Sequence, residues 1–239
     1  MEIGAYFQVY KQPTSTRRSL DYFRSIYPTG TVVLVSDNGL NYSKMAKEFD
    51  CIYFHEPENT NLVFSPTNRQ RILAFFERLR RCVQPIKEDY FLLLEDDVLV
   101  IQRVIEPLVG TVNGNFLNTL PKEKVRFFKN LTHIPCDFQY TGHGGSIVHT
   151  KKFLEMVNDH ELIQYVLDTW DASGLGETMG FDSLLSVLTV VAGGTLAPLA
   201  CKKDYYTDGL FARNVDNVCI LHQCKDLYSS EKFDESVIY

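Results

Sequence analysis

Three consecutive carboxylates, Glu95, Asp96 and Asp97, interrupt an otherwise apolar run over residues 90–100. Such a run predicts a buried strand. Burying ionised carboxylates costs roughly several kcal/mol each, and neighbouring acids also repel one another. We therefore expect the strand to break at Glu95, so that the acids emerge at its C-terminal edge, where a cation is held among them. The alternative is a solvated strand end without a ligand.

A fourth acid, Asp37, closes the apolar run over residues 31–35 with Ser36 between them. In an open α/β sheet the carboxyl ends of the strands form the ligand-binding crevice, so Asp37 and the acids at 95–97 are expected to face it together. Carboxylates suit a hard divalent cation, which in turn suits a diphosphate. No glycine-rich phosphate loop follows the first strand, so the metal and side chains must neutralise the phosphates. Alternatively, Asp37 only caps a turn with Asn38 and Gly39.

The order of elements favours an α/β fold with a mostly parallel central sheet flanked by helices. Strands are predicted at residues 3–10, 31–35 and 51–54, with a helix after each of the first two and hydroxyl candidates for an N-cap at residues 14–16. A longer amphipathic helix, beginning at Ser65-Pro66, precedes the acid-bearing strand. Its arginines at 78, 80 and 81 are interpreted as a solvated face.

The second half of the chain is less regular and predicts a smaller mixed sheet. The expected strands are residues 125–128 and a strand, glycine turn and strand over 138–148. The expected helices are residues 151–157, 162–167 and 181–191, and an apolar run follows at 218–221. Without a convincing linker, we interpret residues 1–239 as a single domain with two functional halves, residues 1–100 and 101–239.

The bulk composition excludes several classes of protein. The formal net charge is −6, which argues against nucleic-acid binding. No run approaches the roughly 18 apolar residues of a membrane span, and the first ten residues do not resemble a signal peptide. Six scattered cysteines fit a reducing compartment. We therefore expect a cytoplasmic protein of a bacterium or large virus, or a fragment of a longer chain.

Taken in order, these motifs resemble the GT-A glycosyltransferases over nearly the whole chain. The resemblance rests on Asp37 after the second strand, the sequence Leu94-Glu95-Asp96-Asp97-Val98, a glycine-rich turn at 142–145, an acid after Gly180-Phe181, and the late sequence His222-Gln-Cys-Lys225. The Glu-Asp-Asp segment resembles the DxD motif of that family. The resemblance implies a hexosyl- or pentosyltransferase that uses a nucleotide-diphosphate sugar, with UDP favoured, and a glycan or glycoconjugate hydroxyl as acceptor. It makes residues 1–100 the nucleotide-sugar-binding half and residues 101–239 the acceptor-binding and catalytic half.

The resemblance also implies roles for individual residues at the donor site. Asp97 and His222 would hold Mn²⁺ or Mg²⁺, and an imidazole beside carboxylates favours Mn²⁺. Glu95 departs from the Asp found in many members, and would act through water or on the ribose. The other donor-binding candidates are Asp37 on the nucleoside, Arg71, Asp96 without a specific contact, Gly144 and Gly145 beside the sugar, and Lys225 on a phosphate.

Asp182 is the candidate catalytic base of an inverting reaction, and Glu177 is the alternative base. Asp182 could instead cap the helix that begins there, since aspartate is a favoured N-cap. His222 could be a surface histidine, and the glycines at 142–145 only a tight turn. Trp170, the sole tryptophan, is either an acceptor-stacking platform or a core residue.

Two other functions stay open on the sequence. A sugar nucleotidyltransferase shares the parallel sheet and the metal-binding carboxylates, but usually opens with a glycine-rich loop and a basic residue after its first strand. Here that place reads Gln8-Val9-Tyr10-Lys11-Gln12-Pro13. A non-catalytic module that binds carbohydrate or nucleotide would not need both Asp97 and His222, because binding alone does not require a metal.

Overall fold

The computed structural model describes residues 1–59, 69–175, 180–204 and 217–224. A seven-stranded sheet is formed by β1 (Gly4–Val9), β2 (Val32–Asp37), β3 (Ile52–Glu56), β4 (Tyr90–Leu94), β6 (Val112–Gly114), β9 (Ile147–His149) and β10 (Leu196–Pro198). Their order is β10-β6-β9-β4-β1-β2-β3. Only β9 runs antiparallel to its neighbours β4 and β6, so the predicted, mostly parallel sheet is confirmed.

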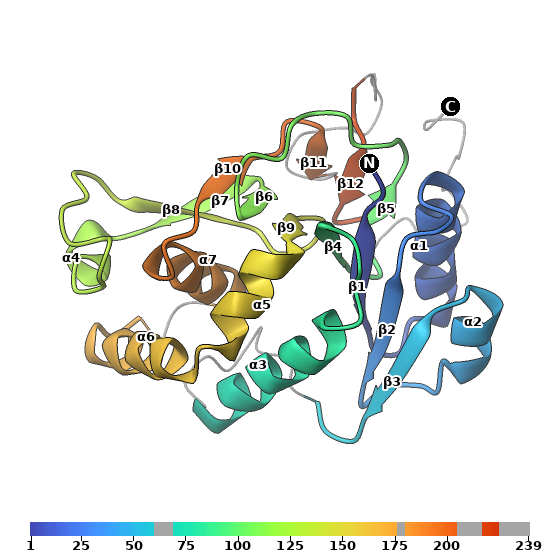
Figure 1. The fold of residues 1–239 in the computed structure, drawn as a ribbon, viewed down its shortest axis with the longest axis horizontal. Helices are drawn as coiled ribbons and strands as arrows, with labels where there is room; N and C mark the ends of the chain where they lie inside the picture. The colour runs from blue at the N-terminus through green and yellow to red at the C-terminus, as the bar shows by residue number, and fades with distance from the viewer. Residues whose placement is uncertain (60–68, 176–179, 205–216, 225–239) are drawn as a thin grey trace.

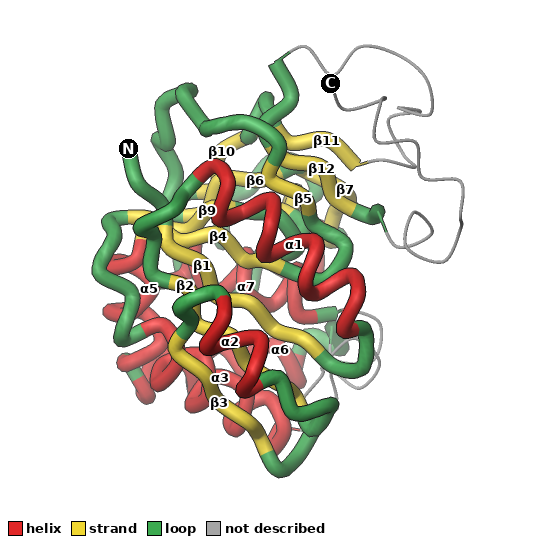
Figure 2. The backbone as a smooth tube through the Cα atoms, turned by 90° about the vertical axis from the view of Figure 1, so that its right-hand side faces the viewer, coloured by secondary structure: helices red, strands yellow, loops and turns green. Residues whose placement is uncertain are grey.

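Helices cover both faces of this sheet. The helices are α1 (Pro13–Ile26), α2 (Ser43–Glu48), α3 (Arg69–Val83), α4 (Lys122–Val125), α5 (Thr150–Asn158), α6 (His160–Ala172) and α7 (Phe181–Val191). Helices α1 and α2 lie on one face, and α3, α5, α6 and α7 lie on the other (Figures 1 and 2). The buried apolar side chains accordingly form two clusters, one on each side of the sheet. Within the described ranges, no helix combines the length and apolar composition that crossing a membrane requires.

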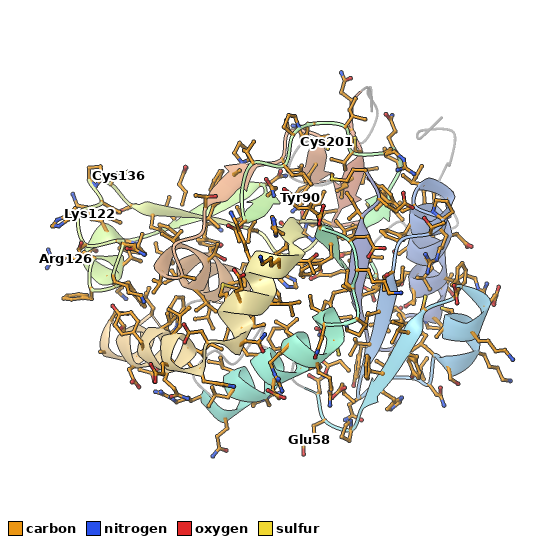
Figure 3. The ribbon with its side chains drawn as sticks, in the orientation of Figure 1. Glu58, Tyr90, Lys122, Arg126, Cys136 and Cys201 are labelled. Carbon is orange, nitrogen blue, oxygen red and sulfur yellow. The ribbon has the colours of Figure 1, made fainter. Side chains whose placement is uncertain are left out.

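The described residues also form two smaller sheets. The first contains β5 (Leu99–Val100), β11 (Lys202–Asp204) and β12 (Ile220–His222) in the order β11-β12-β5. β11 runs parallel to β12, and β12 runs antiparallel to β5. The second is the antiparallel pair β7 (Phe116–Leu120) and β8 (Phe138–Thr141). Together with α4 this pair forms one end of the molecule, where Lys122, Arg126 and Cys136 lie (Figure 3).

The strand order places the acids at the crevice of the main sheet. β1 pairs with β2 on one side and with β4 on the other, both in parallel. The carboxyl ends of these strands, at Val9, Asp37 and Leu94, therefore meet at one edge of the sheet, the edge where open α/β sheets bind ligands.

Two local predictions are wrong. Residues 125–128, predicted as a strand, contain the end of α4 and a turn. Val125 and Phe128 are buried while Phe127 is 59% exposed, so the apolar side chains follow the three-residue spacing of a helical turn. The hydroxyls predicted to cap α1 lie inside it, because Pro13 already starts the helix. Ser15 and Thr16 donate their hydroxyl protons back to the carbonyl of Gln12 instead.

Candidate active site

The acidic segment leaves β4 through a tight turn, in which the amide of Val98 donates to the carbonyl of Glu95. β5 then starts at Leu99, in a different sheet from β4. This break releases the acids from the seven-stranded sheet, as the burial cost of a continuous strand requires. Asp97 is only 3% exposed, whereas the side chain of Glu95 is 34% exposed. Asp97 therefore lies at the buried base of the site, and Glu95 lies at its solvent-facing edge.

His222 reaches these acids because β12 pairs with the strand that follows them. Leu221 of β12 lies opposite Leu99 of β5, so His222 lies beside the turn. Its Nε2 atom is 3.9 Å from Glu95 Oε2 and 4.0 Å from Asp97 Oδ1. One ligand atom from each of these three residues lies within 4.8 Å of the others. Two carboxylates and an imidazole at this spacing fit a divalent cation.

Asp204 fixes the orientation of the His222 ring. Asp204 and His222 are register partners on β11 and β12, and Asp204 Oδ1 lies 2.6 Å from His222 Nδ1. Asn115 Nδ2 donates to the other oxygen at 3.3 Å. Burial would raise the pKa of Asp204, but the hydrogen bond with His222 and the charge of Lys202 lower it below its ordinary value. This contact places Nδ1 against Asp204 and turns Nε2 toward the acids, the arrangement in which a carboxylate orients a metal-binding histidine.

The glycine turn between β8 and β9 closes over this cluster. A Cβ atom on Gly144 would lie 2.5 Å from His222 Nε2 and 2.9 Å from Glu95 Oε2, so a larger residue there would displace the ends of these two side chains. Gly145 has a φ of +73°, which favours glycine. The sequence left open a tight turn or a ligand contact at residues 142–145. The segment is a turn, since Ser146 N donates to His143 O, and Gly144 also borders the cluster.

His143, within that turn, links the cluster to Asp182. Its Nδ1 atom lies 3.3 Å from Glu95 Oε1, and its amide donates to Asp182 Oδ1 at 3.0 Å. Burial raises the pKa of Asp182 above its ordinary value, and the nearby His143 acts in the opposite direction. Asp182 does not cap α7, because Gly180 is the N-cap residue. Its carboxylate points across to the glycine turn instead.

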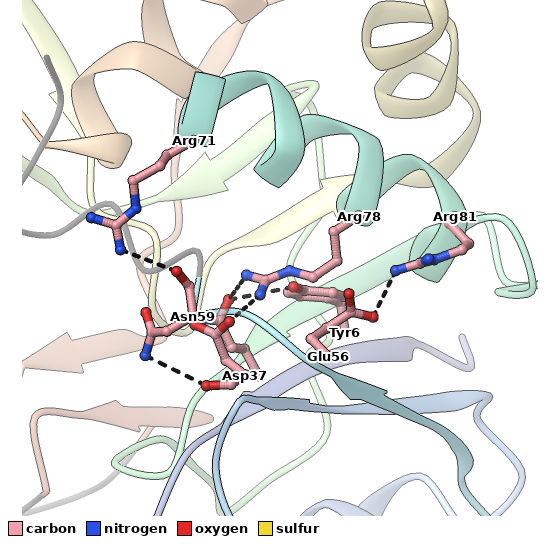
Figure 4. Close-up of polar contacts among 8 residues, drawn as sticks. Tyr6, Asp37, Glu56, Asn59, Arg71, Arg78 and Arg81 are labelled. Atoms are coloured by element: carbon pink, nitrogen blue, oxygen red, sulfur yellow. Dashed lines mark hydrogen bonds and ion pairs between the residues drawn. The ribbon is translucent and has the colours of Figure 1, made fainter. Parts of the chain in front are cut away.

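Asp37 lies in a buried network rather than open at the crevice surface (Figure 4). Its Oδ1 atom lies 2.5 Å from Arg78 Nη1, and Gln8 donates to its Oδ2 at 3.1 Å. Arg78 is 2% exposed, so interpreting this arginine as part of a solvated face is wrong. Asp37 ends a buried strand, and α3 packs Arg78 against it because a buried carboxylate requires a cation.

The remaining candidates occupy varied positions. Arg71 of α3 donates to the carbonyl of Asn59 at 3.0 Å (Figure 4). Asp96, at the centre of the turn, is half-buried and contributes negative charge near Tyr42. Trp170 is 0% exposed and packs against Phe128, so the stacking platform is wrong and the tryptophan belongs to the core. Two further candidates, Glu177 and Lys225, lie outside the described residues.

Reasoning from sequence missed Lys202, Asp204, Asn115 and the side chain of His143. A signal was present for two of them. Lys202 and Asp204 come directly after an apolar stretch and are two residues apart. In a strand, side chains two residues apart face the same side. Only their pairing with β12, however, brings them to the acids.

No family model and no curated protein matches this sequence. Solved structures match it in shape. The galactosyltransferase LgtC, in complex with donor and acceptor sugar analogues, aligns with a TM-score of 0.58 at 11% identity, over 94% of this chain and 87% of LgtC. The apo form of the glycosyltransferase GlyE from Streptococcus pneumoniae TIGR4 aligns with a TM-score of 0.53 at 11% identity, over 100% of this chain and 62% of GlyE. The fold is therefore of the GT-A glycosyltransferase type.

Proposed function

We propose that this protein is a metal-dependent glycosyltransferase, which moves a sugar from a nucleotide-diphosphate donor to a hydroxyl group of a glycan or glycoconjugate. The observation that carries the proposal is the cluster of Glu95, Asp97 and His222 at the carboxyl end of β4, the central strand of a GT-A fold. LgtC, which shares this fold, binds donor and acceptor sugar analogues. UDP is the favoured nucleotide, because it is common among such enzymes.

Asp97 and His222 are the proposed metal ligands, and the position of Glu95 adds it as a third. These residues suit a metal ion. The carboxylate of Asp97 is buried, the imidazole of His222 is oriented by Asp204, and Gly144 leaves room beside them. The imidazole favours Mn²⁺ over Mg²⁺. A divalent cation bound there supplies Lewis-acid stabilisation of the departing diphosphate.

Asp182 is the proposed base that takes the proton from the acceptor hydroxyl, as an inverting reaction needs. Its raised pKa moves the carboxylate toward the operating pH, where a general base is more effective. The amide of His143 holds Asp182 Oδ1 in place. Glu177 is the alternative base. The remaining proposed donor contacts are Asp37, Arg71, Asp96, Gly144, Gly145 and Lys225.

Thermal unfolding with nucleotide and metal tests the proposal. We expect UDP and Mn²⁺ together to raise the melting temperature more than either alone, because a ligand that binds only the native state stabilises it by about 2.7 kcal/mol at 100 times its Kd. Incubation with UDP-sugars and candidate acceptors should then release UDP. Release of pyrophosphate during synthesis of a nucleotide sugar would instead identify a nucleotidyltransferase.

Asp97→Asn should abolish the metal-dependent part of the shift. Asp89→Asn is the matched control, because Asp89 is exposed and precedes the opposite end of β4. If no nucleoside diphosphate shifts the melting temperature of the native chain in the presence of Mn²⁺, the proposed function is wrong.

A further inference from the structure

Lys202, on β11, is a buried cation that the reaction described above does not use. The residue is 1% exposed, and its Nζ atom makes no hydrogen bond to any described residue. Lysine is almost never fully buried unless it is paired, because an ammonium group loses its hydration in the interior. A buried ammonium with three unused N–H donors therefore indicates a ligand that the protein is built to receive.

The fold brings Lys202 to the proposed metal cluster. Lys202 and Asp204 stand two residues apart on β11 and so face the same side, and Asp204 holds His222. A Cβ atom on Gly145 would lie 3.2 Å from Lys202 Cε, so the side chain runs directly beside the glycine turn. The same turn, through Gly144, abuts His222 and Glu95.

Acidic groups surround this cation. The carboxylates in electrostatic range of Lys202 belong to Asp204, Asp182, Glu95 and Asp97. Burial lowers the pKa of Lys202, and these acids oppose that shift. Before any ligand arrives, the attraction of the acids offsets part of the lost hydration of the ammonium group, and the remaining cost is the one that a ligand can relieve.

A bound divalent cation would remove the attraction between these acids and Lys202. Two positive charges on Glu95, Asp97 and His222 cancel the attraction that holds Lys202, and the cation and the ammonium repel each other. A diphosphate carried by the cation restores the balance, because its oxygens accept hydrogen bonds from an ammonium group and bring negative charge.

We propose that Lys202 makes the site select a cation that carries a diphosphate over the bare cation. This inference rests on the proposed function and names a further binding residue for its donor. Lys202 opposes binding of Mn²⁺ alone and contacts the diphosphate that arrives with it. The two effects have opposite signs, which a merely structural lysine would not produce.

Calorimetric titrations of Lys202→Met with Mn²⁺ alone, and with pyrophosphate or UDP in the presence of Mn²⁺, test the inference. Methionine keeps the length of the side chain without its charge. We expect the variant to bind Mn²⁺ alone roughly several-fold more tightly than the native chain. We expect it to bind pyrophosphate and UDP roughly 10- to 100-fold more weakly, the contribution of a charge-assisted hydrogen bond. Lys202→Arg should keep the native order.

Lys203→Met is the matched control, because Lys203 adjoins Lys202 but faces the other side of β11 and is less buried. Its constants should equal those of the native chain. In case Lys202→Met does not fold, the NMR signal of the Lys202 ammonium in the native chain should shift when pyrophosphate is added with Mg²⁺. Absence of that shift overturns the inference.

The outcomes separate the two proposals. If the native chain binds pyrophosphate with Mn²⁺ and Lys202→Met binds it equally well, or loses both ligands in equal measure, Lys202 has no selective role and the inference is wrong. If the native chain binds neither Mn²⁺ nor its complexes, the proposed function fails first.

Discussion

Replacing Asp204 by asparagine should weaken the binding of Mn²⁺ by roughly 10- to 100-fold, the usual effect of removing the partner of a metal-binding histidine. Asp204 Oδ1 lies 2.6 Å from His222 Nδ1, and Asn115 holds the other oxygen at 3.3 Å. Asparagine keeps the shape but removes the charge that orients the ring and makes Nε2 more basic. The expected change equals about 1.4–2.7 kcal/mol, comparable with the roughly 1.5–3 kcal/mol of a hydrogen bond to a charged group.

Calorimetric titration of Mn²⁺ into the purified variant measures this change. Asn115→Ala should have a smaller effect, because the contact between Asp204 and His222 remains. Asp89→Asn, at the opposite end of β4, should bind Mn²⁺ like the native chain. Melting temperatures without metal separate a loss of folding from a loss of affinity. A folded Asp204→Asn variant with native Mn²⁺ affinity would refute the reasoning, since Asp204 would then not orient the ligand.

Three further substitutions probe other parts of the site. Gly144→Ala should fold but lose roughly tenfold or more in Mn²⁺ affinity by calorimetry, because its Cβ would lie 2.5 Å from His222 Nε2; native affinity would contradict the role of Gly144 in leaving room beside the ligands. Asp182→Asn should lower turnover by roughly 10²–10⁴ with donor binding intact, and normal turnover would move the base elsewhere. Because the folded-state pKa of Asp182 is raised, its ionised form destabilises the native state above that pKa; the variant should melt higher at neutral pH, and this gain should disappear as the pH falls. Arg78→Met should lower the free energy of unfolding, measured with urea, by about 3–5 kcal/mol, because the charge of Asp37 is left buried without its partner. Adding Asp37→Asn should restore most of the lost stability.

Much of the framework was predictable from local patterns. Alternating strand and helix signals over the first 100 residues predicted that these strands run parallel, and the strand, glycine turn and strand over 138–148 predicted β8 and β9. The strand predicted at residues 125–128 was wrong because four residues of mixed polarity fit the spacing of a strand and of a helix equally well. Only the burial of Val125 and Phe128 decides between the two.

The sequence by itself determined that the acids must leave the strand at Glu95, because no buried strand tolerates three adjacent carboxylates. Which charges compensate for them was decided only by the tertiary structure. Pairing β12 with β5 brings His222 to Asp97, and pairing β11 with β12 adds Asp204 and Lys202. How well a charge stabilises the acids depends on its distance from them and on how deeply both are buried. For strands far apart in the sequence, both are set only when the strands pair in register. A lysine near the end of an apolar run looks exposed until β11 buries it beside the acids.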